Sequence, residues 1–195
     1  MTVSRETDAR LRLFVDLLLE ENDRQNLISK GSVASVWQRH IEDSLQLLAH
    51  APANARWLDI GSGPGLPGLV LAIAGVDHIT LVEPRRLRTD FLERARARLE
   101  LNNTMIVTGK AEQLSGEFDV ITARAVASLS TLFALGTPLL APNGRWVLPK
   151  GRSAEMELEE ARATWQGKFR LVASRTDPDA KILVADKVRR RAGRG

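Results

Sequence analysis

The segment "WLDIGSGPGLPG" (residues 57–68) has four glycines and two prolines after a short apolar run that contains Asp59. Glycines let a ligand approach the backbone, and a helix that follows them offers unpaired N–H groups. Two patterns overlap, GxGxG from Gly61 and GxGxxG from Gly63, and the second is the fingerprint of dinucleotide sites. The spacing predicts a nucleotide-like ligand, and it is also compatible with a purely structural turn.

Two acidic residues beside this loop indicate which ligand it binds. Asp59 lies at the end of the preceding run, where its carboxylate would repel a pyrophosphate but attract the positive charge of S-adenosylmethionine. Glu83 ends the next apolar run and can accept hydrogen bonds from both hydroxyls of an adenosine ribose, in S-adenosylmethionine or in NAD. Asp59 thus favours the methyl donor, and an NAD-dependent oxidoreductase is the alternative.

The elements that must position these residues follow an alternating pattern. From residue 56 onward, short apolar runs alternate with helical segments, which is typical of an α/β fold with a mostly parallel sheet covered by helices. The last two runs are separated only by "TDPDA", so we expect an antiparallel pair at the sheet edge. The expected strands cover residues 56–60, 78–83, 104–108, 118–124, 144–150, 169–175 and 181–190.

The residues before this pattern have helical spacing instead. Apolar residues recur at helical intervals over 8–19 and 33–48, and Ser32 is a plausible N-cap for the second helix. We therefore predict an N-terminal helical extension over residues 1–55 and a Rossmann-like core over residues 56–195, joined in one globular unit.

Composition excludes several kinds of site. The 195 residues include no cysteine and three histidines, which argues against disulfides, thiolate catalysis and a metal centre. No apolar run approaches the ~20 residues that span a bilayer, and the first residues carry charges where a signal peptide would be apolar. We expect a cytoplasmic protein without a membrane partner.

The positive charge is concentrated in two segments. Residues 186–195 contain five basic side chains and one acidic one, which equals the net charge of +4 of the whole chain, and residues 84–98 contain six arginines and two acidic residues. Such patches suit a polyanion such as RNA, although solvated surface arginines would give the same count. The candidate phosphate contacts are Lys150 and the tail residues Lys187, Arg189, Arg190, Arg191 and Arg194.

Several separated motifs resemble one family, the bacterial 16S ribosomal RNA guanine-N7 methyltransferases of the RsmG type, also called glucose-inhibited division protein B. The matching segments span most of the chain and are "RQNLIS" (24–29), "RHIEDSL" (39–45), "LDIGSGPGLPG" (58–68), "GKAEQL" (109–114), "TARAVASL" (122–129) and "LPKG" (148–151). The resemblance implies a class I Rossmann-like S-adenosylmethionine-dependent methyltransferase that modifies N7 of a guanine in the 530 loop of 16S rRNA. Its partner would be 16S rRNA or the small ribosomal subunit, and we expect a monomer.

The resemblance also implies which residues hold the methyl donor. They are the first glycine of the loop, the residue after its third glycine, an adenine-side pair, and an arginine after the fourth strand. In this sequence these positions are Gly61, Leu66, Ala111, Glu112 and Arg124. Two positions depart from the family pattern, Ile28 where threonine is frequent and Pro84 after Glu83, and neither is a matched donor position.

The chemistry of guanine N7 requires no general base, because its lone pair carries no proton. Alignment of N7, the methyl carbon and the sulfur would supply the rate enhancement, so we predict no catalytic side chain. A cation aimed at N7 would oppose the reaction, and we therefore expect Arg124 to contact the donor carboxylate, O6 or a phosphate, or to form a structural ion pair. We expect His40 to pack in the core, with a contact to the substrate as the alternative, and we expect Asn26 and Asp43 to cap helices or to tie helix to sheet. A ribosome-assembly or RNA-binding factor that holds the donor without turnover is the remaining alternative.

Overall fold

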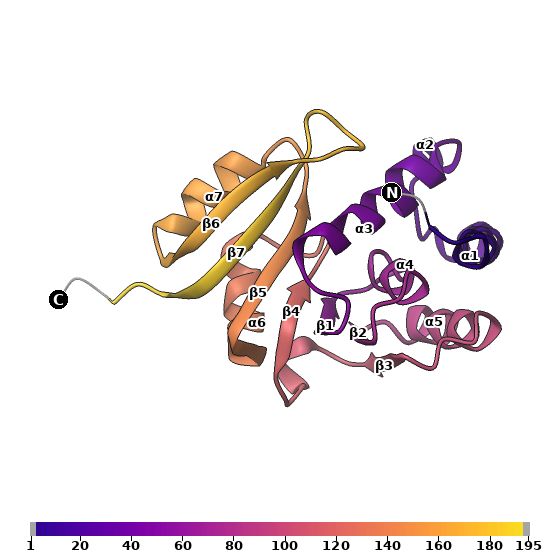
Figure 1. Cartoon of the computed structure of the whole chain (residues 1–195), viewed down its shortest axis with the longest axis horizontal. Coiled ribbons are helices and arrows are strands. Elements are labelled where there is room, and N and C mark those ends of the chain that lie inside the picture. The colour runs from indigo at the N-terminus through magenta and orange to yellow at the C-terminus, as the bar shows by residue number, and fades with distance from the viewer. Residues whose placement is uncertain (1–2, 193–195) are drawn as a thin grey trace.

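The fold is a twisted seven-stranded sheet between two layers of helices, as Figure 1 shows for a computed structural model of the chain that describes residues 3–192. The strand order is β3-β2-β1-β4-β5-β7-β6, with parallel pairing from β3 to β5 and antiparallel pairing of β7 with β5 and β6. The strands are β1 (Arg56–Ile60), β2 (His78–Glu83), β3 (Thr104–Thr108), β4 (Phe118–Thr122), β5 (Leu140–Lys150), β6 (Trp165–Ala173) and β7 (Lys181–Arg190). The expected mixed sheet with an antiparallel edge pair is confirmed.

Helices cover both faces of the sheet because inner strands such as β1 and β2 bury side chains on both sides. Trp57 on β1 belongs to one apolar cluster with the N-terminal segments and the helices after β1 and β2, while Leu58 belongs to the other cluster with the helices after β4 and β5. The helices are α1 (Arg5–Gln25), α2 (Lys30–Val33), α3 (Asp43–Leu45), α4 (Gly68–Ile73), α5 (Arg86–Arg98), α6 (Leu129–Gly136) and α7 (Ala154–Arg162). In the part of the chain that the structure describes, no helix is both long and apolar enough to cross a membrane.

The N-terminal helices lie on the first layer. Ser4 caps α1, whose Leu11, Phe14 and Leu18 are fully buried against α4 and α5. The largely buried Glu21 accepts a hydrogen bond of 2.8 Å from Arg94 on α5. Residues of α1 belong to the same buried apolar cluster as residues of β1 and α4, so α1 is part of the core on this face of the sheet.

The segment expected as one helix over residues 33–48 is broken. It consists of α2, a π-helix η1 (Trp37–Glu42), α3 and the 3₁₀ helix η2 (Gln46–His50). The expected N-cap role of Ser32 is wrong, because Ser29 occupies that position and Ser32 is buried inside α2. A wider π turn changes which side chains face the sheet, and such turns are frequent at functional sites.

The remaining short helices connect the strands. The 3₁₀ helix η3 (Ala111–Gln113) follows β3, and η4 (Thr137–Leu139) precedes β5. Because β1, β2, β4 and β5 run parallel, the glycine loop, the segment after Glu83, the segment after Thr122 and the segment after Lys150 emerge at one edge of the sheet. This edge is where open α/β sheets bind ligands.

Candidate active site

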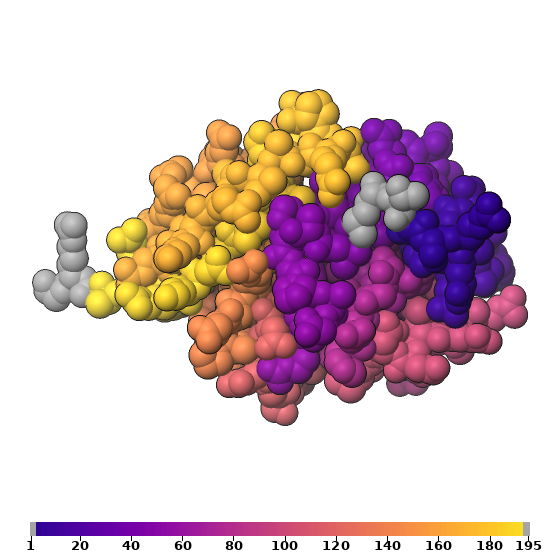
Figure 2. Space-filling model, in the orientation of Figure 1, coloured from indigo at the N-terminus to yellow at the C-terminus, as the bar shows by residue number. Residues whose placement is uncertain are grey.

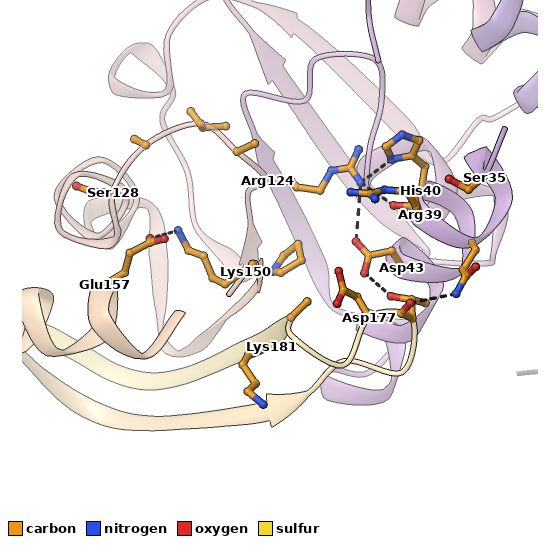
Figure 3. Close-up of a pocket in the computed structure, with 18 residues that line it drawn as sticks. Ser35, Arg39, His40, Asp43, Arg124, Ser128, Lys150, Glu157, Asp177 and Lys181 are labelled. Atoms are coloured by element: carbon orange, nitrogen blue, oxygen red, sulfur yellow. Dashed lines mark hydrogen bonds and ion pairs between the residues drawn. The ribbon is translucent and has the colours of Figure 1, made fainter. Parts of the chain in front are cut away.

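Two adjoining cavities lie at the carboxyl edge of the parallel strands. The smaller has a volume of about 530 Å³ and is lined by the glycine loop and by Glu83, Arg85 and Arg88. The larger, drawn in Figure 3, has a volume of about 800 Å³ and is lined by segments of η1, the loop after β4, the end of β5, α7 and the β6–β7 turn. Arg39, His40 and residues 124–126 line both, so these residues separate and connect the two spaces.

A buried carboxylate, that of Asp59, holds the end of the glycine loop. Asp59 is fully buried, and its Oδ2 accepts a hydrogen bond of 3.0 Å from the Gly68 N–H at the start of α4. Oδ1 has no hydrogen-bond partner among the described residues. Burial raises the pKa of Asp59 to about 7, against the opposing effect of the Gly68 N–H. Asp59 lines neither cavity. Its position therefore gives no support to the direct attraction of a positive ligand that the sequence suggested.

Glu83 lies directly beneath the loop and reaches the smaller cavity. Its two carboxylate oxygens accept hydrogen bonds of 3.0 Å from the backbone N–H groups of Gly63 and Arg85. Arg88 lies 3.7 Å from Oε2. Each oxygen keeps a further lone pair, and Glu83 lines the smaller cavity, so it has acceptor capacity left for the ribose hydroxyls expected from the sequence.

The backbone of the loop has the conformation that glycine allows. Gly61 and Gly63 have φ angles of +67° and +53°, and a side chain on Gly61 would meet Val126 at 2.6 Å. An added Cβ on Gly63 would make only ordinary van der Waals contact, with Arg88 Nη1 nearest at 3.6 Å, and Gly63 lines the smaller cavity. The loop, the smaller cavity beside it and the Glu83 carboxylate fit an adenosine-bearing ligand.

The other residues predicted to hold the donor differ in whether they line the smaller cavity. Leu66 lines the smaller cavity although its side chain is almost completely buried. Ala111 is buried and Glu112 is exposed, and neither lines either cavity. The segment before them is nevertheless beside Glu83, because the Gly109 N–H donates to the Glu83 carbonyl at 3.1 Å. The adenine-side assignment of residues 111 and 112 stays a prediction.

Arg124 sits at the junction of the two cavities and is held by the N-terminal segment. Its Nη1 lies 3.1 Å from His40 Nδ1 and 3.8 Å from Asp43 Oδ2. The exposed fraction of the Arg124 side chain is 19%. The interaction with Asp43 is an ion pair of the kind considered from the sequence, and the closer contact of the guanidinium is with His40. Desolvation lowers the pKa of Arg124 from its usual value, and the nearby Asp43 opposes this shift.

His40 is not the packed core residue expected from its helical position. It is half-buried and lines both cavities, with Nε2 at 3.1 Å from Ser32 Oγ. Desolvation, followed by the charges of Arg124 and Arg39, lowers its pKa to about 4. Arg39 and His40 both belong to the π-helix η1, and both line the two cavities.

A polar network that sequence reasoning missed closes the larger cavity. Asp43 Oδ1 accepts hydrogen bonds from Thr176 Oγ1 at 2.8 Å and from Gln46 Nε2 at 2.9 Å. Gln46 also accepts from the Arg175 N–H at 2.9 Å. This network ties the β6–β7 turn to the N-terminal segment, and Figure 2 shows these two surfaces in contact although about 130 residues separate them in the chain. Asp43 is therefore one of the ties considered from the sequence, whereas Asn26 is a left-handed C-cap of α1.

The basic residues predicted to contact RNA are divided between two ends of the sheet. Lys150 lines the larger cavity, where its Nζ pairs with Glu157 at 2.8 Å. The exposed Lys187, Arg189 and Arg190 lie at the other end of β7, because Lys181 pairs with Lys150 and Arg190 pairs with Trp165. Nine strand residues correspond to roughly 30 Å, so this end does not border the cavities (Figure 1).

The tail itself is partly bound to the protein surface. Arg190 stacks over the Trp165 ring with a distance of 5.5 Å to its centroid. Arg191 Nε donates to the carbonyl oxygen of Arg162 at 2.7 Å. Arg194, which the sequence analysis included in the tail, lies outside the described residues.

The site geometry can be compared with known proteins. Residues 7–176 match the GidB family, described as rRNA small subunit methyltransferase G. The chain belongs to this family. It is 45% identical over 181 residues to the ribosomal RNA small subunit methyltransferase G of Novosphingobium aromaticivorans, covering 90% of this chain and 79% of the relative, and 41% identical over 189 residues to that of Gluconobacter oxydans, covering 97% and 98%. The predicted family is thus confirmed, and the chain is a methyltransferase rather than an oxidoreductase.

Solved structures show the same fold at low sequence identity. The chain resembles M. jannaschii TYW2 in complex with AdoMet, with a TM-score of 0.61, 13% identity, and coverage of 85% of this chain and 78% of that one. It also resembles the ribosomal protein L11 methylase from Lactobacillus delbrueckii subsp. bulgaricus, with a TM-score of 0.58, 17% identity, and coverage of 76% and 77%. The Rossmann-like methyltransferase fold is confirmed.

Proposed function

We propose that this protein transfers a methyl group from S-adenosylmethionine to N7 of a guanine in the 530 loop of 16S rRNA. The observation that carries the proposal is the pair of adjoining cavities that meet at Arg124 and His40. The cavity at the glycine loop suits the donor, and the larger one suits a nucleobase, since pockets for small molecules typically measure roughly 300–1,000 Å³. The names of the relatives specify small subunit rRNA.

The donor side of the site depends on backbone groups and carboxylates. S-adenosylmethionine supplies a methyl group on positively charged sulfur when it is bound. Glu83 would orient the ribose, and the loop from Gly61 to Leu66 would lie along the donor with its shape fixed by Glu83 and Asp59. Arg124 lines this cavity as well and could reach the donor carboxylate. These residues bind and orient, and none of them needs to exchange a proton.

The charges at the junction of the two cavities bear on the reaction at N7. The reaction gives the guanine a positive charge, so positive side chains close to N7 would oppose it. His40 stays neutral at physiological pH because its pKa lies near 4, and Asp43 holds the Arg124 guanidinium. The enzyme would therefore act by aligning N7 with the methyl group in a cavity closed on one side by the β6–β7 turn, which is a proximity effect.

We further propose that the chain acts as a cytoplasmic monomer on the small ribosomal subunit or its 16S rRNA. In this proposal residues 1–55 and 56–195 work as one unit, because the larger cavity contains residues from both ranges. The target guanine must leave any base pair to enter the cavity, as enzymes that modify bases require. Residues 187–191 would contact phosphates away from the target.

The substrate proposal is tested by mass spectrometry of 16S rRNA from a strain that lacks this gene, with and without the gene restored. We expect N7-methylguanosine in the 530 loop to disappear in the deletion strain and to return with the gene. An unchanged amount of the modified base would contradict the proposal. Purified protein and radiolabelled donor then separate an enzyme from a factor that binds RNA without turnover, because only the enzyme transfers label.

A further inference from the structure

An ion pair forms the wall of the larger cavity opposite Arg124 and His40. Lys150 at the end of β5 lies 2.8 Å from Glu157 Oε2 on α7, and Ser153 Oγ donates to Oε1 at 2.8 Å. The exposed fractions of the Lys150 and Glu157 side chains are 10% and 23%. Figure 3 shows the pair on the side of the cavity away from Arg124, His40 and Asp43.

The pair is charged and has hydrogen-bonding capacity left. Desolvation raises the pKa of Glu157, but the hydrogen bonds from Lys150 and Ser153 outweigh it, so the pKa lies below its usual value and the carboxylate is ionised. The Lys150 ammonium has two further N–H donors, and each Glu157 oxygen has a second lone pair. Lys150 is thereby neutralised by its partner, which makes it a poorer phosphate contact than the sequence suggested.

Asp43, a second carboxylate that lines the larger cavity, is placed differently from Glu157. Oδ1 of Asp43 already accepts from Thr176 and Gln46, and Oδ2 faces Arg124. Asp43 thus serves the tie between segments, whereas Glu157 presents acceptors toward the cavity. On the side of the cavity away from Arg124, a ligand meets the Lys150 ammonium as a donor next to the Glu157 carboxylate as an acceptor (Figure 3).

We infer that Lys150 and Glu157 recognise the Watson–Crick edge of the target guanine, an inference that rests on the proposed function. That edge carries the O6 acceptor beside the N1–H and N2–H donors, which complements an ammonium beside a carboxylate. Adenine carries a donor at N6 and an acceptor at N1, so it would place donor against donor and acceptor against acceptor. The pair therefore selects guanine over adenine.

The orientation required by this contact agrees with the position of the two cavities. N7 lies on the five-membered ring, away from N1 and N2. Lys150 and Glu157 line only the larger cavity, whereas His40 and Arg124 line both. A guanine gripped at its Watson–Crick edge consequently directs its five-membered ring toward the junction with the donor cavity. Such a grip requires an unpaired base, as is typical of sequence-specific recognition of RNA loops.

Inosine at the target position tests the inference, because inosine lacks the N2 amino group but keeps N1–H, O6 and N7. Small subunits reconstituted with guanosine or inosine at that position serve as substrates for the wild-type enzyme and for Glu157→Gln. A hydrogen bond to a charged group predicts that kcat/KM of the wild type is roughly 10- to 100-fold higher for guanosine. In Glu157→Gln, kcat/KM for guanosine falls and the guanosine-to-inosine ratio moves toward one.

Controls separate this role from a structural one. Glu155→Gln removes an exposed carboxylate of the same helix and should keep the wild-type ratio. A Glu157→Gln enzyme that loses activity on both substrates with an unchanged ratio would make the ion pair purely structural. A wild-type ratio near one overturns the inference even if the variant does not fold. Absence of N7-methylguanosine with the guanosine subunit and wild-type enzyme would instead contradict the proposed function.

Discussion

The two cavities are built in different ways, and we call them the donor half and the acceptor half after the ligands that we propose for them. The donor half is a continuous loop, residues 61–68, whose shape is set by backbone N–H groups donating to Asp59 and Glu83. The acceptor half uses side chains from η1, the loop after β4, the β5–α7 connection and the β6–β7 turn. Local backbone geometry thus makes one half, and long-range contacts between side chains make the other. Changes in the two halves should therefore have different consequences.

The largest effect is expected from Gly68→Ala in the donor half. An added Cβ would lie 2.6 Å from Asp59 Oδ2 and 2.7 Å from Leu81 Cγ, both in the buried core. Overpacking of this kind typically costs about 1–3 kcal/mol, and disturbance of the Asp59 hydrogen bond adds to it. We expect a lower free energy of unfolding in urea and weaker donor binding by calorimetry.

Gly31→Ala is the matched control, since its added Cβ would meet no atom within 4 Å. Its free energy of unfolding should equal or slightly exceed that of the wild type. Equal stability of both variants would show that the donor loop is not as tightly packed as the structure indicates.

Arg124→Met tests the junction between the halves. The change removes the contacts with His40 and Asp43 and should lower kcat/KM by roughly tenfold or more, given the usual value of a charge-assisted hydrogen bond. Since desolvation is the main cause of the low pKa of His40 and Arg124 is the second, that pKa should rise above about 4 without reaching its ordinary value. NMR titration of the His40 ring measures this shift, and an unchanged pKa would mean that Arg124 does not act on it.

Asp59→Asn tests the buried carboxylate by its pH dependence. The folded-state pKa of about 7 lies above the ordinary value of 3.8, so between these values the folded protein binds more protons than the unfolded chain. The free energy of unfolding therefore falls as pH rises through this window, by at most about 1.4 kcal/mol per pH unit from this group. Asparagine cannot ionise, so in Asp59→Asn the part of the pH dependence that Asp59 causes should be absent. Urea unfolding of both proteins from pH 5 to 7 measures the difference. Identical slopes for both proteins would contradict the raised pKa.

The smallest effect is expected outside both halves, in the basic end of β7. Arg189→Ala combined with Arg190→Ala should weaken RNA binding, reduce the salt slope by roughly one to two, and leave donor affinity unchanged. Arg10→Ala combined with Arg12→Ala removes the same charge from α1 and is the control. If the slope is the same for wild type and both variants, the end of β7 does not contact phosphates.

The difference between the halves also explains how far the sequence could be interpreted. The strands over 56–60, 78–83, 104–108 and 181–190 were predicted at their observed bounds, because hydrophobic runs and turn residues are local signals. Glu83 was likewise expected beside the glycine loop from strand order, and Leu66 from the resemblance to the family motif, and both line the smaller cavity. The burial of Asp59 was not, because a carboxylate beside a loop gives no sign of which side of the backbone it occupies.

The acceptor half had no comparable signal. His40 was expected in the core because its spacing fits an α-helix, whereas the chain forms a π turn that faces the cavity. Thr176 and Gln46 meet across 130 residues, and Glu157 lies on a helix whose acidic residues look alike in sequence. The sequence by itself determined the sheet, the glycine loop and the family, since these depend on local periodicity and on motifs. Only the tertiary structure decided which charged side chains face each other, because that depends on how separate segments pack.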